Sequence, residues 1–355
     1  MSIKSLIINP GSTSTKIAVF DDETLLLEET LRHTTEELSV FASIAEQKSF
    51  RKDIIVKMFA DNDFDIHSLN MVVGRGGLLR PIESGTYTIC DKMVADLENH
   101  ERGEHASNLG GLIAKEIADL LDIPAFIVDP VVVDELIPEA RLSGIPEIPR
   151  VSIFHALNQK AIAKRHAREV GRAYNELNVI VVHMGGGVSV GAHQKGRVVD
   201  VFNALDGDGA FSPERAGGIP SGALVRMCYS GRYTEKEMLK KITGGGGINA
   251  YLGTNDFSEV DEKSAAGNSE WKLVREAFIM QVSKDIGAMA CVLSGDVDFI
   301  LLTGGIAFSK KLTAELTRRV GFIAPVLVYP GEGELLALAE GALRVMRGEE
   351  EARQY

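Results

Sequence analysis

The chain opens with three short apolar runs separated by turn residues. Residues 4–8, 16–20 and 25–31 are rich in branched aliphatic side chains, and residues such as Asn, Gly, Ser and Asp lie between the runs. Branched side chains pack well on a pleated sheet, and turn residues between such runs are typical of antiparallel neighbours. The pattern therefore predicts that the chain begins with a three-stranded meander.

Helical and strand patterns alternate after the meander. Apolar residues recur at helical spacing over residues 36–59 and 104–121, and short apolar runs at 71–73 and 125–128 are typical of buried strands. Strands that alternate with helices favour a mixed sheet covered by helices. The fold class predicted from this part of the chain is α/β.

A change of pattern predicts the domain boundary. The stretch 138–149 contains proline and glycine, and Ser152 is expected to cap a helix that runs to about residue 174. At 355 residues the chain is longer than one hydrophobic core usually serves. We therefore expect an N-terminal α/β domain over residues 1–150, which the C-terminal helix 333–355 could rejoin, and a C-terminal α/β domain over residues 151–332.

Residues 179–192 repeat the layout of the opening. In both places an apolar strand ends near a polar residue, Asn9 or His183, turns through small residues and continues as a second strand that meets a third. This repetition predicts a duplicated strand–turn–strand core. Further helices are expected at 223–227, 235–242, 271–293 and 333–347, with a buried strand at 298–302.

The first turn carries the residue types that bind phosphate. Gly11 lets the backbone approach an anion, Ser12 and Ser14 supply hydroxyl donors, and Lys16 supplies a positive charge. The turn is not a Walker loop, because the G-x-x-x-x-G-K-[ST] spacing is absent and a strand follows it. A polar hairpin turn can have the same composition, so the phosphate interpretation depends on the partners that the turn finds.

Two other glycine turns are candidate ligand sites. The turn at residues 183–187 resembles G-x-G-x-x-G, but residues 188–190 alternate like a strand where that motif needs a helix, which excludes a dinucleotide-binding fold there. Gly304 and Gly305 follow a strand and precede a helix, a common place for a ligand in an α/β sheet. The run 244–247 is expected to be a flexible connector.

Charge and composition narrow the range of partners. A net charge of −12 argues against broad binding to nucleic acid or to anionic membranes, which need a basic surface. The three cysteines are odd in number and far apart, which favours a reducing compartment over a disulfide framework. Because no apolar run approaches the ~18 residues that span a bilayer, we expect a cytoplasmic protein that binds neither nucleic acid nor membrane.

Six segments together resemble the motifs of the acetate and butyrate kinase family, and butyrate kinases fit better than acetate kinases. The segments are 6–16, 72–79, 127–136, 152–161, 183–187 and 213–220. The resemblance covers nearly the whole chain. It implies a two-domain fold of the actin and sugar-kinase superfamily, with a duplicated core and an active-site cleft between the domains.

The resemblance also implies an activity. The expected reaction is the reversible transfer of phosphate from ATP to a short-chain fatty acid, best guess butyrate, giving butanoyl phosphate and ADP with the help of Mg²⁺. Isobutyrate, propionate and acetate stay open as substrates, because one buried methylene contributes only ~0.8 kcal/mol. A homodimer or a larger homo-oligomer is expected from the same resemblance.

The family's catalytic and acid-binding positions can be carried over to this sequence. Asp129, His155 and Arg215 match the catalytic positions. Arg75 matches the arginine that binds the carboxylate, but the motif is spaced differently here and Arg80 remains a rival.

The metal and nucleotide positions follow in the same way. Asn9 and Glu334 match the positions that contact magnesium. Ala307-Phe308-Ser309 replaces the Gly-Glu-Asn of acetate kinases, which leaves the contacts to the base open. The implied phosphate and nucleotide contacts are Ser12, Ser14, Lys16, His183, Gly185, Gly186, Gly187, Asp256, Phe257, Ser258, Gly304 and Gly305.

These residue types suit the implied chemistry. A carboxylic acid has a pKa near ~4 and is already ionised at neutral pH, so it needs no general base. The obstacle is repulsion between two anions, which Mg²⁺, Lys, Arg and His can neutralise. We therefore expect Asp129 to organise magnesium or water. An actin-like scaffold or chaperone is the rival hypothesis, but it would need no acid-binding arginine, so Arg75 and Arg215 favour the enzyme.

Overall fold

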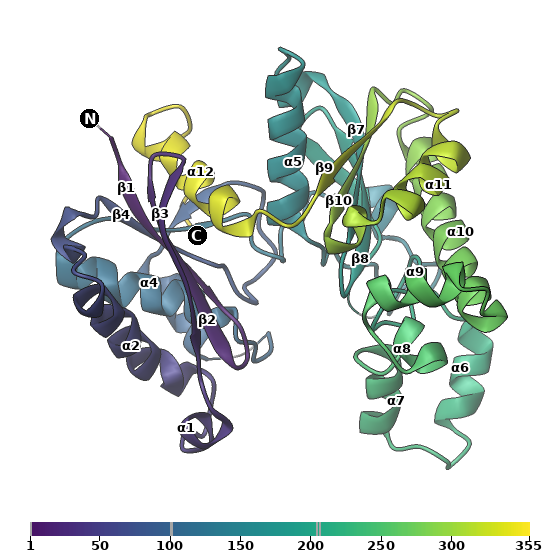
Figure 1. The fold of residues 1–355 in the computed structure, drawn as a ribbon, viewed down its shortest axis with the longest axis horizontal. Coiled ribbons are helices and arrows are strands. Elements are labelled where there is room, and N and C mark those ends of the chain that lie inside the picture. Colours follow the sequence, from purple (N-terminus) through teal and green to yellow (C-terminus); the bar gives the residue numbers. More distant parts are fainter. Residues whose placement is uncertain (1, 100–101, 204, 206) are drawn as a thin grey trace. The chain divides into compact units, whose positions relative to one another are not determined.

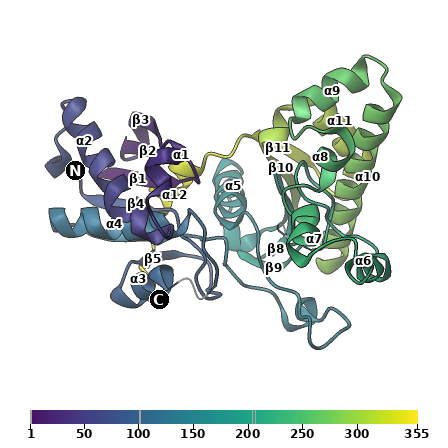
Figure 2. The ribbon, with the colours of Figure 1, turned by 90° about the horizontal axis from the view of Figure 1, so that it is seen from below.

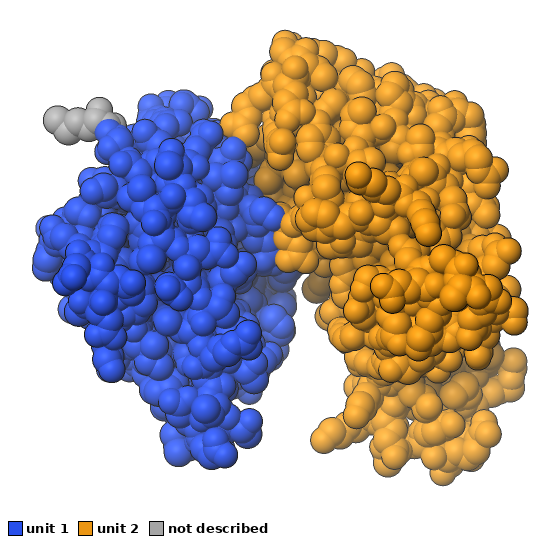
Figure 3. Space-filling view, viewed as in Figure 1, with its two compact units in different colours: residues 1–133, 333–355 blue, residues 134–332 orange. Residues whose placement is uncertain are grey.

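A computed structural model describes residues 2–99, 102–203, 205 and 207–355. The chain forms two compact units, coloured separately in Figure 3. Unit 1 contains residues 1–133 and 333–355, and unit 2 contains residues 134–332. Within the described residues no helix combines the length and the apolar character needed to cross a membrane.

Unit 1 is built on a six-stranded mixed sheet in the order β3-β2-β1-β4-β6-β5 (Figure 1). Strands β1 and β2, and then β2 and β3, pair antiparallel, while β4 runs parallel to β1 and β6 runs parallel to β4. The predicted meander is therefore confirmed. The strand bounds are β1 Lys4–Pro10, β2 Ser14–Asp21, β3 Thr24–Arg32, β4 Met71–Gly74, β5 Thr86–Thr88 and β6 Ala125–Val128.

Helices cover both faces of this sheet. Helix α4 packs on β1, β4 and β6 from one side, with α2 and α3 against it, and α12 packs on the same three strands from the other side (Figure 1). The single helical stretch expected at 36–59 is interrupted, because the short α1, which a capping box at Thr34 opens, ends at Ser39 and α2 begins only at Lys48. The helix bounds are α1 Thr35–Ser39, η1 Ala45–Gln47, α2 Lys48–Asp61, η2 Ile66–Ser68, α3 Asp91–Glu98, α4 Asn108–Leu121 and α12 Glu334–Met346.

Unit 2 repeats the same strand topology. Its sheet has the order β11-β10-β7-β8-β9, in which β7, β8 and β9 pair antiparallel and β10 and β11 continue parallel to β7. This order matches β6-β4-β1-β2-β3 of unit 1, so the predicted duplication is confirmed. The strand bounds are β7 Asn178–Met184, β8 Val188–Gln194, β9 Arg197–Val201, β10 Phe299–Gly304 and β11 Val326–Pro330.

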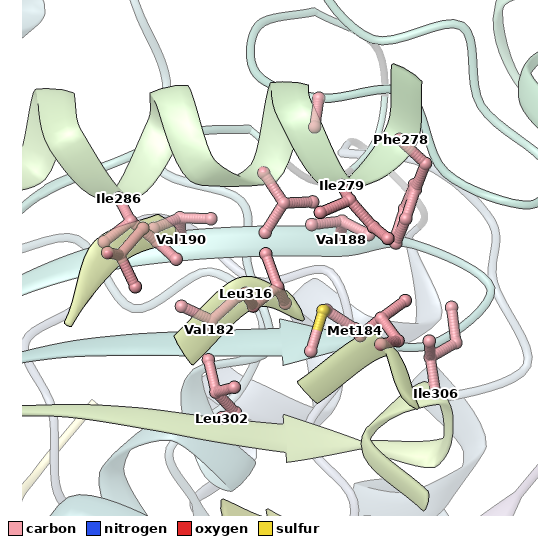
Figure 4. Packing of buried hydrophobic residues seen from close by; sticks show 14 of the residues in the cluster. Val182, Met184, Val188, Val190, Phe278, Ile279, Ile286, Leu302, Ile306 and Leu316 are labelled. Carbon is pink, nitrogen blue, oxygen red and sulfur yellow. The ribbon is translucent and has the colours of Figure 1, made fainter. Parts of the chain in front are cut away.

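The core of unit 2 lies between this sheet and α10. Figure 4 shows Ile279 and Phe278 of α10 beside Val188 of β8, and Ile286 of α10 beside Val190 of the same strand. Helix α5 lies on the opposite face of the sheet (Figure 2). The helix bounds are η3 Pro138–Arg141, α5 Ala156–Glu169, η4 Tyr174–Glu176, α6 Ser221–Cys228, α7 Glu235–Ile242, α8 Gly247–Leu252, α9 Phe257–Ala265, α10 Ser269–Val292, η5 Gly305–Phe308 and α11 Lys310–Val320.

The expected start of α5 was wrong. Ser152 is buried and lies outside the helix, whereas His155 occupies the capping position and the helix ends at Glu169. No side chain caps the first turn of α5. The position that a capping residue would take is instead occupied by a histidine, which is a first sign that this end of the helix has another role.

Residues 134–150 pack with unit 2, whereas the sequence analysis placed them in the N-terminal domain. Glu135 is 6% exposed and pairs with the buried Lys160 at 2.6 Å, while its carboxylate also accepts from the Val198 amide at 2.7 Å. Arg150 pairs with Asp200 at 2.8 Å. These pairings join positions that are far apart in the chain, so local spacing does not reveal them.

Candidate active site

A buried arginine of unit 1 holds the turn between β1 and β2 from inside. Arg51 of α2 is 1% exposed, and its Nη1 donates to Gly11 O at 2.8 Å and to Ser14 O at 3.0 Å. Its Nη2 donates to Ser12 O at 3.0 Å, and Thr13 O accepts at 2.9 Å from the amide of His33, the residue that follows β3. All four carbonyl oxygens of residues 11–14 are therefore used by the protein itself.

This arrangement leaves the hydrogen-bond donors of the turn for a ligand. In the described part of the chain, the amide groups of Ser12 and Thr13 and the hydroxyls of Ser12 and Ser14 make no hydrogen bond. Adjacent donors of this kind form an anion-binding nest. Burial lowers the pKa of Arg51 to about 10, so its guanidinium still carries a positive charge at neutral pH.

The sequence analysis missed Arg51. The available signal was its place on the buried face of α2, where it shares a stripe with Ile55, Met58 and Phe59. A charged residue in an apolar stripe is uncommon unless it is paired, because burying an unpaired charge is costly. Here the carbonyl oxygens of the phosphate turn and Gln47 Oε1, at 2.8 Å, supply the partners.

Three of the predicted site residues meet at the end of the unit 1 sheet. Asn9 is the penultimate residue of β1, and its Nδ2 donates to Glu334 Oε2 at 2.9 Å. Arg75, which follows β4, forms an ion pair with the same Glu334 oxygen. Their side chains are only 14% and 17% exposed, so the pair is sheltered but still reachable.

Two glycines bring Arg75 to this place. A Cβ on Gly74 would lie 2.1 Å from Gly110 O, and a Cβ on Gly110 would lie 2.3 Å from Arg75 O. Only glycine at both positions allows α4 to approach the end of β4 so closely. The Arg75 amide donates to Ile8 O at 2.8 Å, so the chain stays in register with β1 up to the arginine.

Arg80, the rival of Arg75, has another environment. Its guanidinium lies over the ring of Tyr355 at 4.1 Å, and its amide donates to the Tyr355 hydroxyl at 3.2 Å. That hydroxyl donates to Asp96 at 2.7 Å, and burial together with this bond raises the pKa of Tyr355 to about 12. These contacts fix the C-terminal tyrosine, which favours Arg75 as the acid-binding residue.

Asp129 lies directly after β6 in a strained backbone conformation. Its φ is 39°, a region that non-glycine residues rarely adopt, and it is 3% exposed. The carboxylate accepts from Ser84 Oγ at 2.6 Å and from the Gly85 amide at 2.8 Å. Strain of this kind is concentrated at functional sites. Lys16, in contrast, extends over β3 and pairs with Glu28 at 3.0 Å.

In unit 2 the two predicted histidines stack on each other. The rings of His155 and His183 lie 3.8 Å apart between centroids, with 11° between their planes. His155 Nδ1 lies 2.9 Å from Ser189 Oγ, and the buried His183 Nδ1 lies 2.8 Å from Asn158 Oδ1. The start of α5 therefore meets β7 and β8 through this pair.

The second phosphate turn joins β7 to β8. Its glycines, Gly185, Gly186 and Gly187, form a tight turn in which the Gly185 amide donates to Gly187 O at 2.9 Å. Ser212 Oγ donates to Gly186 O at 2.7 Å and accepts from the Arg215 amide at 3.2 Å. Ser212 thus links the turn directly to the segment that carries Arg215.

The glycine run before α8 fixes the Arg215 segment, and the expectation of a flexible connector was wrong. A Cβ on Gly247 would lie 1.8 Å from Ser212 O and 2.6 Å from Arg215 O. The Gly244 amide donates to Glu214 O at 2.8 Å. The run allows a close approach between two backbones. Arg215 itself lines a small recess together with Asp208 and Ser212.

The phosphate turn and the predicted adenosine segment line one cavity of unit 2. The cavity measures about 540 Å³, within the usual range for a ligand site. Asp256 caps α9, and it accepts from Ser258 through both the amide, at 2.8 Å, and the hydroxyl, at 2.6 Å. The lining residues are Gly185, Gly186, Pro213, Asn255, Asp256, Phe257, Ser258, Asp261, Glu262, Gly305, Ile306, Phe308, Ser309 and Glu332.

Two of the predicted nucleotide residues have mainly structural contacts, and Gly304 does not line the cavity. The Phe257 side chain packs in the core, with its ring 5.2 Å from that of Phe278. Gly304 ends β10 and exchanges two backbone hydrogen bonds with Gly331 at 3.1 and 3.0 Å. Phe308, in contrast, is 67% exposed at the cavity. The sequence analysis had left its role open.

Comparisons with known proteins agree with the fold and the sequence motifs. The acetokinase family matches residues 148–322. Butyrate kinase 2 of Clostridium acetobutylicum is 59% identical over 355 residues and is covered over its whole length, as is this chain. A second relative, butyrate kinase 1 of the same organism, is 57% identical over 350 residues and covers 99% of each chain.

Solved structures show the same fold at low sequence identity. The crystal structure of Porphyromonas gingivalis acetate kinase aligns with a TM-score of 0.77 at 18% identity, over 96% of this chain and 99% of that one. A ROK family protein from Streptococcus pneumoniae in complex with sucrose aligns with a TM-score of 0.55 at 11% identity, over 98% of this chain and 100% of that one. The predicted actin and sugar-kinase-like fold is thereby confirmed. Full-length identity at this level to the butyrate kinases places the chain in the acetokinase family, and it is a kinase, as the motifs predicted.

Proposed function

We propose that the chain catalyses the reversible, ATP-dependent phosphorylation of a short-chain fatty acid, with butyrate as the preferred acid. The observation that carries this proposal is the cavity of unit 2, where a phosphate-binding turn and a capped α9 segment line the same space. The relatives at 59% identity are named butyrate kinases, which supports the choice of acid. Butanoyl phosphate and ADP are the products.

The reaction needs positioning and charge neutralisation more than proton transfer. A carboxylate oxygen of the acid attacks the γ-phosphorus of ATP, a new O–P bond forms, and the bond to the β–γ bridging oxygen breaks with its electron pair going to ADP. No proton has to move, because the acid is already ionised at neutral pH. The barrier falls when cations and N–H donors stabilise the transferring phosphoryl group.

The residues of unit 1 suit the acid and the phosphate. Arg75 has five N–H donors, so its bond to Glu334 still leaves donors for a substrate carboxylate. The donors of the β1–β2 turn, which Arg51 holds in place, suit phosphate oxygens. Asp129 is held by two hydrogen bonds and is proposed to orient magnesium or water.

The residues of unit 2 suit the nucleotide and the transition state. His155, His183 and Arg215 are proposed to stabilise the transferring phosphoryl group. The acidic rim at Asp256, which accepts hydrogen bonds, suits the hydroxyls of a ribose. The exposed ring of Phe308 offers a face for stacking of the base.

The oxygen atoms of Asn9 and Glu334 fit magnesium. Mg²⁺ is usually held by one or two protein oxygens together with water and substrate phosphates. When bound there, Mg²⁺ would neutralise charge on the phosphates of ATP.

A hydroxylamine trapping assay tests the proposal. Full-length protein is incubated with ATP, Mg²⁺ and one acid at a time from a C2–C6 panel, and acyl hydroxamate is measured. We expect butyrate to give the highest kcat/KM. Acids that differ by one methylene are expected to differ in kcat/KM by about 10- to 200-fold at most, because one buried methylene contributes little binding energy.

Matched variants test the acid-binding arginine in the same assay. Arg75→Gln is expected to raise the KM for the acid, whereas Arg80→Gln leaves it unchanged because Arg80 contacts Tyr355. The absence of hydroxamate with every acid would refute the proposed reaction, and ATP binding without any phosphoryl transfer to an acid would favour the actin-like scaffold.

The proposal extends to assembly and location. We propose a cytoplasmic homodimer or larger homo-oligomer. The exposed apolar side chains of Leu142, Ile145 and Ile148, on one segment of unit 2, are consistent with a surface that a second copy covers. A light-scattering mass equal to one chain would contradict this part of the proposal.

A further inference from the structure

A chain of hydrogen bonds runs through unit 2 to His155. Tyr174 Oη lies 2.7 Å from His193 Nδ1, and His193 Nε2 lies 3.0 Å from Gln159 Oε1. Gln159 Nε2 lies 2.8 Å from Ser189 Oγ, which lies 2.9 Å from His155 Nδ1. This hydrogen-bond chain links η4, β8 and α5. Which atom donates in each of its hydrogen bonds can be worked out from groups that can only donate or only accept.

The direction is fixed at Gln159. Its Nε2 also contacts the backbone carbonyl of Ser189 at 3.1 Å, and a carbonyl oxygen can only accept. The amide nitrogen must therefore face Ser189, and Oε1 must face His193. Since Oε1 can only accept, His193 carries a proton on Nε2.

The far end of the chain agrees with this direction. His193 is fully buried, and burial together with the nearby positive charge of Lys160 holds its pKa well below the usual value. The ring is therefore neutral and has only one proton, on Nε2. Its Nδ1 accepts from the Tyr174 hydroxyl.

The near end then determines the proton on His155. Ser189 is fully buried, and within the described residues its Oγ contacts only Gln159 Nε2, which donates to it, and His155 Nδ1, so Nδ1 is the acceptor for the Ser189 proton. A ring nitrogen that accepts carries no proton. The neutral His155 ring therefore has its proton on Nε2.

Asn158, the residue before Gln159 on α5, places the proton of His183 on the other ring nitrogen, Nδ1. Asn158 Nδ2 donates to the Glu332 carbonyl at 2.5 Å, which turns Oδ1 toward His183. His183 Nδ1 lies 2.8 Å from Asn158 Oδ1. Because Oδ1 can only accept, His183 carries its proton on Nδ1. Asn158 and Gln159 thus set opposite tautomers on two stacked rings.

We infer that Gln159 and Ser189 are positioning residues that hold His155 as a neutral Nε2–H donor for the transferring phosphoryl group. This inference rests on the proposed function for the identity of the acceptor. A donor that is set before the substrate arrives lowers the barrier, because no reorganisation is needed during the reaction. His183 donates through Nδ1 instead, so the two stacked rings use different nitrogens as donors.

Nuclear magnetic resonance of the full-length protein tests the tautomers without using activity. Protein labelled with ¹⁵N-histidine has eight histidines, and long-range ¹H–¹⁵N correlation spectra separate Nδ1–H from Nε2–H rings. Spectra of His155→Gln and His183→Gln variants assign the two signals. We expect Nε2–H for His155 and Nδ1–H for His183, and an Nδ1–H ring at His155 would overturn the inference.

Variants at Ser189 link the tautomer to the rate. Ser189→Ala removes the donor to Nδ1, so His155 is expected to populate both tautomers and kcat to fall by about 10-fold or more, with a smaller change in the KM for ATP. Ser189→Thr keeps a hydroxyl and is expected to restore both the spectrum and kcat. A folded Ser189→Ala variant with an unchanged tautomer and an unchanged kcat would contradict the role of Ser189.

A matched control comes from unit 1. Ser5 is also a fully buried strand serine, but its hydroxyl has no hydrogen-bond partner among the described residues, so Ser5→Ala is expected to leave the His155 signal and kcat unchanged. The two proposals fail separately. A wild-type protein that phosphorylates no acid would refute the proposed function and leave the tautomers standing, whereas an active protein with Nδ1–H at His155 would refute only this inference.

Discussion

The segment that carries Arg215, a proposed catalytic residue, is held by contacts from several elements. Its amide is bonded to Ser212, its carbonyl receives the Ser212 amide at 3.0 Å, and Gly247 lets the α8 backbone pack directly on it. The arginine is thereby fixed next to the phosphate turn.

Substitution of Arg215 tests that role. Arg215→Ala is expected to lower kcat by about 10²-fold or more, because the developing charge on the phosphoryl group loses a donor. Arg215→Lys keeps the charge but not the planar pair of donors, so its kcat is expected to lie between that of the wild-type protein and that of Arg215→Ala. Steady-state kinetics with saturating ATP and acid measure the effect.

The control for this prediction is Arg226→Ala. Arg226 is exposed on α6 of the same unit, and its loss is expected to change kcat by less than about twofold, as for most surface substitutions. An Arg215→Ala variant that folds and keeps the wild-type kcat would remove Arg215 from the site.

At the scale of an element, the phosphate turn of unit 1 depends on α2. From the helix, Arg51 donates to the carbonyl oxygens of Gly11, Ser12 and Ser14. The helix therefore holds the shape of the turn, and the donors of the turn are proposed to bind phosphate.

Removal of Arg51 should affect stability and phosphate binding together. Arg51→Met leaves the carbonyl oxygens of Gly11 and Ser12 without this donor, while Ser14 O keeps the Gly11 amide, and each buried unsatisfied group costs about 1–3 kcal/mol. We expect a lower midpoint of urea unfolding and a dissociation constant for ATP that rises by about 10-fold or more. Equilibrium unfolding and titration calorimetry measure the two effects.

Arg344→Met is the matched control. Arg344 lies on α12 and pairs with Glu350 at 2.7 Å on the surface of the same unit, so its loss should leave ATP binding unchanged. If Arg51→Met bound ATP as well as this control, the turn would not depend on α2.

At the scale of the whole molecule, unit 2 gives stability a particular pH dependence. Burial raises the pKa of Asp285 to about 7, although the carboxylate accepts from the Ala210 amide. Burial also raises the pKa of Asp200, against the opposing effect of Arg150. A carboxyl group with a raised pKa binds its proton more tightly in the folded state, so its contribution to stability is lost as pH rises from about 4 to about 7.

Thermal unfolding between pH 5 and pH 8 tests this sign. Ionisation of Asp285 is expected to lower the Tm of the wild-type protein as pH rises through this range. Asp285→Asn should reduce that fall, because the amide cannot ionise and its oxygen can still accept from Ala210. Asp119→Asn, on the exposed end of α4, is the control, with a side chain 61% exposed. An equal slope in the wild-type and Asp285→Asn proteins would contradict the prediction.

The local sequence pattern predicted those elements whose formation depends on neighbouring residues in the chain. The strands β1 to β3 and β7 to β9 were expected because alternation and turn residues specify them, and the family motifs follow the same turns. The expected cap at Ser152 was wrong because the start of α5 is determined by contacts with β7 and β8. The role of Arg51 and the place of residues 134–150 were missed for the same reason, since they depend on residues far apart in the chain.

The repeated strand order of the two sheets separates what duplication preserved from what changed afterwards. Asn9 and His183 occupy the same penultimate position of β1 and β7, and their cross-strand partners are Lys16 and Ser189. In unit 1 the pair is the amide of Asn9 beside the cation of Lys16. In unit 2 the pair is the imidazole of His183 beside the hydroxyl of Ser189, which sets the proton of His155. The ancestral half thus contributed the locations, and divergence supplied each location with its own chemistry.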